Sequence, residues 1–195
     1  IVSLLLFLSC VILDHLSGFV HWRFLSIAAA LMLLFSQGSI IFQCQGISAW
    51  KNPLTIPLFI SSGLLSGFGY AVFLNMLFPF FGDGAVFFTG AITIALNLAG
   101  VFLFLSNHHD AEIYKASAVL RKPVFVILNI GFALLFPLVL LFLLHLDSAI
   151  ISSLLARNIT LISIAFTTLS GGVILKVSII LVAGYKRTLY FTQVG

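Results

Sequence analysis

The amino-acid sequence predicts an all-α integral membrane protein, a polytopic bundle of helices. Of its 195 residues, 62% are hydrophobic and 7% are charged, whereas soluble domains carry about 25% charged residues. The mean hydropathy is +1.26, and several apolar runs exceed the roughly 18 to 20 residues that cross a hydrocarbon core about 30 Å thick. These runs are continuous rather than alternating, which favours helices over a β-barrel because a helix satisfies its own backbone in lipid.

Six apolar segments are expected to cross the membrane and to form one domain over residues 1–195. The expected spans are residues 1–13, 24–42, 55–78, 85–105, 123–144 and 159–184. The first is too short to cross a bilayer unaided and begins without methionine, which indicates that residues upstream are missing.

The connections between these spans carry turn and boundary signals. "AWKNPLTIP" places an aromatic side chain, a cation, Pro53 and Pro57 ahead of the third span, and small residues follow it. Trp50 and Lys51 are typical of a membrane interface, and the small residues predict close helix packing. Pro123 fits a first helical turn, whereas Pro137 lies inside the fifth span and is expected to kink it.

The distribution of Lys and Arg predicts the orientation. One side of the membrane collects Lys51, Lys115, Arg121, Lys122, Lys186 and Arg187, and the other side has Arg23 and Arg157. The positive-inside rule therefore places the "AWKNP" connection, the long 106–122 connection and the C-terminus in the cytoplasm. Because the basic residues lie in these short connections, the net charge of +4 is not a nucleic-acid signal.

Polar residues within spans are the candidate functional groups, since each needs a partner or a hydrated cavity in the membrane. Lys176 lies about 13 Å below the end of the last span at 1.5 Å per residue, and it either faces a bundle cavity or snorkels to the interface. Gln37 and Gln43 lie in the cytoplasmic half of the second span. Asn97 and Asn129 lie within the fourth and fifth spans, where hydrogen bonding between helices and ligand binding are both open.

The histidines and cysteines do not form a cofactor pattern. His15 and His145 fall at span ends, and no second pair across the membrane completes a set of haem ligands, so no haem is expected. His108 and His109 lie in the long connection beside acidic residues, where a solvated docking loop is favoured over a metal site. No metal is expected, and no cluster of catalytic side chains is visible.

Three stretches resemble one family. "AWKNPLTIPLFISSGLLSG" is similar to a motif of the membrane anchors of molybdenum-containing respiratory oxidoreductases: the dimethyl sulfoxide reductase anchor and polysulfide reductase membrane subunit family. "RKPVFVILNIGFALLFPLVLLFL" resembles that family's helix with an internal proline, and "GGVILKVSIILVAGY" resembles the last span of its sulfite dehydrogenase-like branch. The matching positions are Ala49, Trp50, Asn52, Pro53, Leu54, Thr55, Pro57, Arg121, Lys122, Pro137, Gly172, Lys176, Ala183, Gly184 and Tyr185.

The resemblance implies a multi-pass subunit of the bacterial inner membrane that interacts with quinone or quinol, either menaquinone or ubiquinone, in anaerobic or sulfur respiration. It also implies an iron–sulfur subunit and a molybdopterin catalytic subunit as partners. The candidate quinone contacts are Gln37, Gln43, Trp50 and Lys176. The alternatives are a small transporter or channel, and a structural anchor without quinone.

Overall fold

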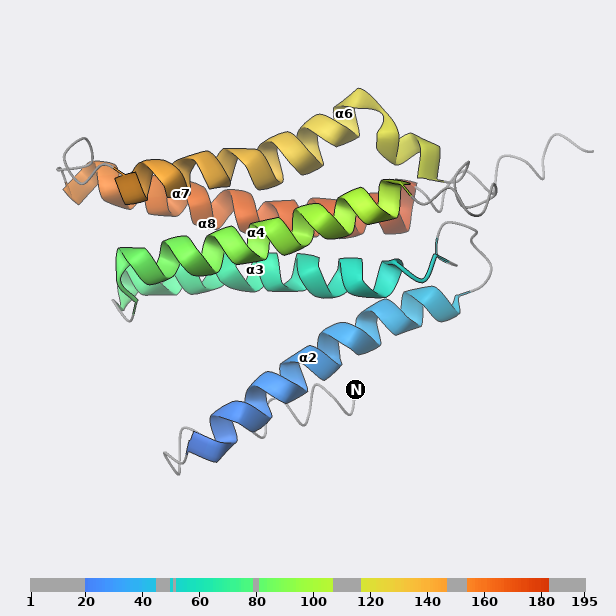
Figure 1. Ribbon diagram of the computed structural model, residues 1–195, viewed down its shortest axis with the longest axis horizontal. Coiled ribbons are helices and arrows are strands. Elements are labelled where there is room, and N and C mark those ends of the chain that lie inside the picture. The colour runs from blue at the N-terminus through green and yellow to red at the C-terminus, as the bar shows by residue number, and fades with distance from the viewer. Residues whose placement is uncertain are drawn as a thin grey trace, which may run out of the picture.

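The computed structural model describes residues 20–44, 50, 52–78, 81–106, 117–146 and 154–182. Within these ranges, five helices are long and apolar enough to span a membrane (Figure 1). The candidate spans are Phe24–Gln43, Thr55–Leu77, Asp83–Ser106, Pro123–Leu146 and Leu155–Ile180. The predicted helical membrane protein is confirmed with these five spans. The predicted span 1–13, most of the 106–122 connection and the C-terminal residues 183–195 lie outside the described residues.

The helices have the following bounds along the chain. α2 covers Val20–Gln43, α3 covers Thr55–Leu77, α4 covers Asp83–Ser106 and α8 covers Leu154–Val177. The span Pro123–Leu146 consists of α6 (Pro123–Val126), the π-helix η3 (Ile127–Leu135) and α7 (Phe136–Leu146). The 3₁₀-helix η2 (Ser117–Arg121) precedes it. A second π-helix, η4 (Ser178–Val182), continues α8.

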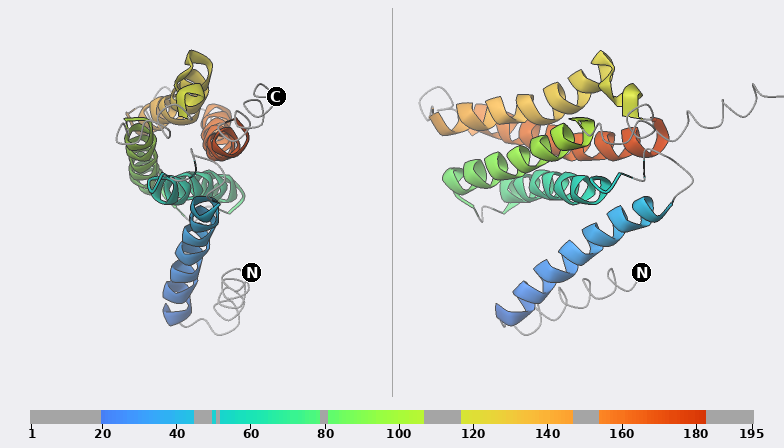
Figure 2. Two further views of the ribbon diagram at one scale, coloured as in Figure 1. Left: turned by 90° about the vertical axis from the view of Figure 1, so that its right-hand side faces the viewer. Right: turned by 45° about the vertical axis from the view of Figure 1, so that its right-hand side comes forward.

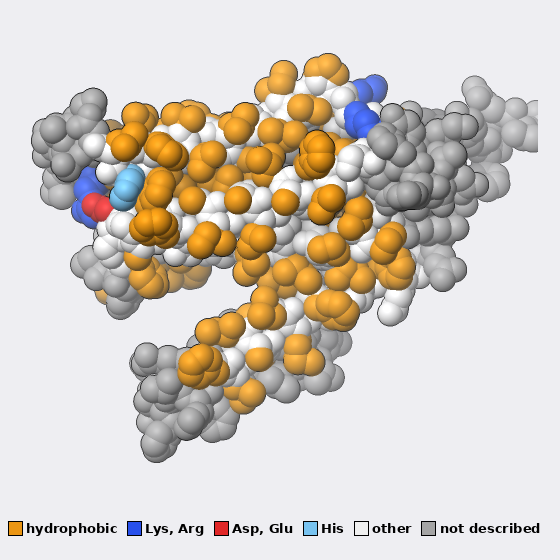
Figure 3. All heavy atoms as spheres, in the orientation of Figure 1, with side chains coloured by type: hydrophobic (Ala, Val, Ile, Leu, Met, Phe, Trp, Pro, Cys, Tyr) orange, Lys and Arg blue, Asp and Glu red, His pale blue; other side chains and the backbone are white. Residues whose placement is uncertain are grey.

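α3, α4, the α6–η3–α7 span and α8 form what we call the main bundle, and α2 leans away from it (Figure 2). α3 packs most extensively against α8 and also contacts α2 and α4. On the face shown in Figure 3, the charged side chains of the described residues gather at the two ends of the molecule and hydrophobic side chains cover the surface between. We call these ends the Trp50 end and the Asp83 end.

Asn52 organises the start of α3. The backbone N–H of Leu54 donates to Asn52 Oδ1 over 3.0 Å, and that of Thr55 donates to the Asn52 carbonyl over 2.9 Å. Asn52 and Thr55 are both fully buried. Pro53 precedes the helix and Pro57 lies in its first turn, where a missing N–H breaks no helical hydrogen bond.

Upstream of Pro137, where the sequence predicts a kink, the structure has the π-helix η3. Proline has no N–H, and its ring crowds the carbonyl four residues earlier, that of Ala133. The hydrogen bonds upstream are therefore widened, and the N–H of Phe136 reaches back five residues to the Gly131 carbonyl. A widened turn of this kind is a recognised response to a break in the helical ladder.

The last helix, α8, begins at Leu154, whereas the last span was predicted to begin at residue 159. Arg157, a charge that the prediction left outside the span, lies in the first turn of α8. Its guanidinium donates to the Asp83 carboxylate over 2.6 Å, at the start of α4. Because this ion pair joins two helix ends, the charge is accommodated at the Asp83 end.

Small residues let α3 and α8 approach closely, as the sequence predicted. A Cβ on Gly172 would lie 2.7 Å from the Ser62 carbonyl oxygen, and a Cβ on Gly69 would lie 2.8 Å from that of Ala165. Only glycine fits at these two positions, because real Cβ atoms do not come so close to backbone oxygens. The α3–α8 seam is therefore the tightest described part of the main bundle.

The buried side chains form two hydrophobic clusters. The cluster towards the Asp83 end comprises Leu65, Phe68, Val72, Val86, Ile94, Ala133, Leu134, Leu141, Leu144, Leu161, Ile164 and Ala165. The cluster towards the Trp50 end comprises Leu58, Phe59, Val101, Phe104, Leu120, Leu175 and Ile179. Buried polar residues separate the two clusters along each helix: Ser61 and Ser62 on α3, Asn97 on α4, Asn129 on η3, and Thr167 and Thr168 on α8.

Candidate functional site

A groove of about 540 Å³ lies between α2, α3 and α4. Figure 3 shows the molecule hollowed between α2 and the main bundle, with hydrophobic side chains on both sides. The lining residues are Ala30, Leu33, Leu34, Gly63, Leu64, Gly67, Phe68, Ala71, Val72, Phe81, Ala85, Val86, Thr89 and Thr93. The volume lies within the range of small-molecule sites, and all but two of these residues lack a polar side chain.

Small residues on α3 create the floor of this groove. Gly63, Gly67 and Ala71 recur every fourth residue and so share one face of the helix. A Cβ on Gly63 would collide with Leu34 of α2, which marks the point where the two helices touch. A Cβ on Gly67 would meet no atom within 4 Å. The groove opens where α2 leaves this contact and α3 presents no side chain to fill the space.

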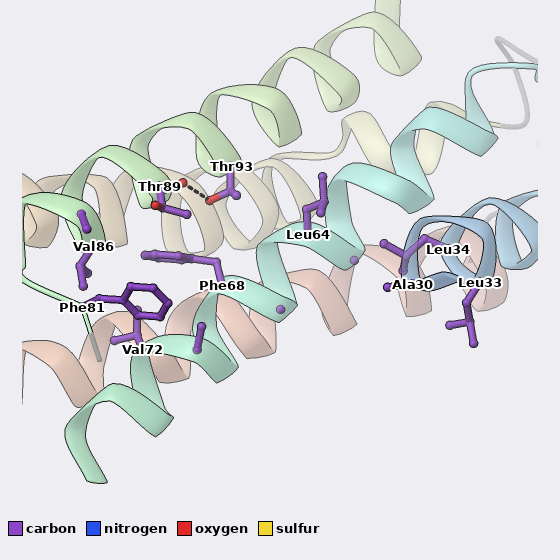
Figure 4. A pocket seen from close by; sticks show the side chains of 14 residues that line it. Ala30, Leu33, Leu34, Leu64, Phe68, Val72, Phe81, Val86, Thr89 and Thr93 are labelled. Carbon is purple, nitrogen blue, oxygen red and sulfur yellow. Dashed lines mark hydrogen bonds between the residues drawn. The ribbon is translucent and has the colours of Figure 1, made fainter. Parts of the chain in front are cut away.

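The two threonines add little polarity to the groove. Thr93 Oγ1 donates within α4, at 3.0 Å from both the Thr89 and the Gly90 carbonyl oxygens. Figure 4 shows Thr89 and Thr93 on α4 above Phe68, with Ala30, Leu33 and Leu34 of α2 on the other side. The groove therefore offers an apolar surface along which a hydrocarbon chain can lie.

Asn75 fixes one end of the groove and was not among the candidate residues predicted from the sequence. Its Nδ2 donates to the Phe81 carbonyl over 3.0 Å, and its Oδ1 accepts from the Phe81 N–H over 2.7 Å. These two bonds close the turn between α3 and α4 and hold Phe81, which lines the groove. The signal was an asparagine shortly before the "PFFGDG" turn, a residue type that commonly binds nearby backbone in turns.

Gln37 is the predicted quinone contact that lies nearest to the groove along α2. It follows Leu33 by four residues and Leu34 by three, so it continues the face of α2 that lines the groove by one helical turn. Its side chain is exposed. Gln43, also exposed, is the last residue of α2 and lies at the Trp50 end. Neither glutamine is among the residues that line the groove.

Trp50 and Lys176 both lie near the end of α8. Trp50 Nε1 donates to the Ile179 carbonyl over 3.2 Å, and its ring packs against the cluster at the Trp50 end. Since indole has one N–H, this bond uses the donor that a quinone carbonyl would need. Lys176 lies three residues before Ile179, is half-buried, and forms no hydrogen bond or ion pair with a described residue. The structure thus brings two of the four predicted contacts to one region, away from the groove.

Asn97 and Asn129 are both buried, at 1% and 7% exposure. Asn129 Nδ2 donates to the Phe125 carbonyl of its own helix over 2.9 Å. No described residue pairs with Asn129 Oδ1 or Asn97 Nδ2. Among the described residues, these atoms therefore form no hydrogen bond between helices, which was one of the two alternatives for Asn97 and Asn129.

No group of three or more potential metal ligands occurs among the described residues. His145, which is exposed at the end of α7, stacks on Phe87 with ring centroids 4.3 Å apart. His15, the other histidine predicted at a span end, lies outside the described residues, as do His108 and His109. Comparisons with protein-family models, curated proteins and solved structures found no match to this chain.

Proposed function

We propose that this chain is the membrane anchor of a molybdopterin-dependent respiratory oxidoreductase, and that the groove between α2, α3 and α4 holds the isoprenoid tail of a quinone or quinol. The observation that carries the proposal is the groove itself, which is about 540 Å³ in volume, apolar and formed within membrane-spanning helices. An amphipathic ligand with a long hydrocarbon tail fits such a surface better than a polar solute does.

The groove alone gives little selectivity, because lipid tails are as apolar as the leucines that line it. Selectivity must come from a polar contact with the quinone ring, and Gln37 is positioned to provide it one turn beyond the groove on α2. Its amide N–H can donate to a quinone carbonyl, and its amide oxygen can accept from a quinol hydroxyl. Gln43, Trp50 and Lys176 stay predictions as further contacts.

The partners follow from the sequence resemblance. The catalytic molybdopterin subunit exchanges electrons with an iron–sulfur subunit, and the quinone held by the anchor completes the chain. Oxidation of a quinol to a quinone releases two electrons and two protons. We place the Trp50 end and the C-terminus in the cytoplasm of a bacterium, with support from Arg121 and Lys122 at that end and from the pairing of Arg157 with Asp83 at the other.

The test is to purify the chain gently from its native membrane, identify copurifying proteins by mass spectrometry and extract quinones from the same sample. A molybdopterin subunit, an iron–sulfur subunit and bound quinone would support the proposal. Bound quinone without redox partners would support the groove as a quinone site and would contradict the assignment to this class of complex. Redox partners without quinone would favour the structural anchor, and a chain that purifies alone would favour a transporter.

Two variants test whether the quinone binds in the groove. Gly67→Phe places a ring in the groove, from a position where a Cβ meets no atom within 4 Å. We expect quinone content to fall at least several-fold. Gly84→Phe is the matched control, since Gly84 is equally open but does not line the groove. Unchanged quinone in Gly67→Phe would contradict the assignment.

A further inference from the structure

A second, much smaller cavity of about 20 Å³ lies inside the main bundle, towards the Trp50 end. Leu58 of α3, Val101 and Phe104 of α4, and Leu175 of α8 contribute to its wall, and Asn129 of η3 is its one amide side chain. A cavity needs about 10–15 Å³ to hold one water molecule. This cavity is therefore large enough for one water and too small for a quinone ring.

The orientation of the Asn129 amide is fixed by its hydrogen bond. The Phe125 carbonyl can only accept, so the atom 2.9 Å from it must be the donor Nδ2. This leaves Oδ1 as a buried acceptor that pairs with no described residue. Buried acceptors of this kind are normally satisfied by protein or by ordered water.

Two features of the surroundings point to water as the partner. Asn129 lies in the π-helix η3, and ordered water is one of the partners that satisfy polar groups where a membrane helix departs from α-helical geometry. Asn97 lies one turn before Val101 on the same face of α4, and its buried Nδ2 also lacks a partner among the described residues. A water molecule can donate to Asn129 Oδ1 and accept from an amide N–H, which neither a cation nor an anion can do.

We propose that this cavity binds one structural water molecule, held by Asn129 Oδ1, and that the layer of buried polar residues between the two hydrophobic clusters is hydrated at this point. The site is independent of the quinone proposal because it shares no lining residue with the groove. The bound water gives the interior of the bundle one exchangeable hydrogen-bonding group. The side chains that line the cavity, apart from Asn129, are apolar.

X-ray radiolytic footprinting of the whole protein in detergent tests this site, because bound water is activated in place and labels the side chains beside it. Phe104 and Phe59 belong to the same cluster and are 2% and 4% exposed, but only Phe104 lines the cavity. We expect Phe104 to be labelled several-fold faster than Phe59. Equal labelling of the two rings would overturn the proposal.

The variant Asn129→Leu removes the acceptor and is expected to lower the labelling rate of Phe104 to that of Phe59. Asn158→Leu is the control, since it removes an amide from α8 that does not line the cavity, and it should leave both rates unchanged. Persistent labelling of Phe104 in a folded Asn129→Leu protein would show that Asn129 does not hold the water. If this variant does not fold, the comparison of the two rings in the natural protein decides the matter.

Discussion

The most apolar windows of α2 and α4 have the same mean hydropathy, yet the structure uses the two helices differently. In the most apolar window of α2, 11% of the residues are buried, against 33% for α4 and 44% for α3 and α8. α2 touches α3 where Gly38 approaches Ile56 and Leu34 approaches Gly63, whereas α3 and α8 share a continuous seam of small residues. Hydropathy thus indicates which segments enter the membrane, and small residues at matched positions decide which helices form the core.

If the α3–α8 seam holds the main bundle together, then Gly172→Val should have the largest effect. The new side chain would meet the Ser62 carbonyl oxygen, 2.7 Å from the Cβ position, and backbone cannot move as a side chain can. We expect a loss of about 3 kcal/mol in stability, measured as a lower melting temperature and less monodisperse protein in detergent. Gly67→Val is the control, and similar losses for the two would contradict the role of the seam.

Asn75→Ala tests the turn that links α3 to α4 on the wall of the groove. The substitution leaves the Phe81 N–H and carbonyl without their partner, which we expect to cost about 2 kcal/mol. Thermal unfolding measures this cost, and quinone extraction reports whether Phe81 still closes the groove. A melting temperature equal to that of the natural protein would show that the turn holds without Asn75.

Gly38→Val should detach α2 and leave the main bundle folded. A Cβ at Gly38 would lie 2.9 Å from Ile56 Cα, so the two helices must separate, whereas the α3–α8 seam is not touched. We expect a stability loss of about 1 kcal/mol. A spin label on Cys44, paired with one on α3 in a Cys10→Ser background, should report a longer and broader distance distribution.

An unchanged distance distribution in Gly38→Val would show that α2 is held by contacts other than this glycine. A collapse of the whole protein would show instead that α2 belongs to the folding core, and the contrast between α2 and the main bundle would then be wrong.

The smallest effect is expected for Arg157→Gln, which removes the ion pair with Asp83 at the Asp83 end. The two side chains are 39% and 43% exposed, so solvent screens the pair and the loss should be about 0.5 kcal/mol. The effect should shrink further in high salt, measured by thermal unfolding across a salt series. A large loss that is insensitive to salt would mean that the pair organises the ends of α4 and α8 more strongly than its exposure indicates.

Some features of the site were predictable and others were not. The glycines of "GLLSGFG" were predicted to bring helices together, and Gly63 and Gly69 do so, but Gly67 faces the open groove instead. Trp50 was predicted at a membrane boundary and not as a donor to Ile179, 129 residues away. The helical period determines on which face of α3 each glycine lies. Which of these faces meets a neighbouring helix depends on contacts remote in sequence.

The amino-acid sequence by itself determined that the protein is a bundle of membrane helices, where five of the spans lie and where proline would disturb one of them. These properties follow from the length of apolar runs and from backbone chemistry, which are local. Only the tertiary structure decided that α2 leans away, that a groove opens beside Gly67, and that Asn129 Oδ1 is buried beside a small cavity. Such features arise from the fit of side chains between helices, because all the spans are equally compatible with lipid until packing distinguishes them.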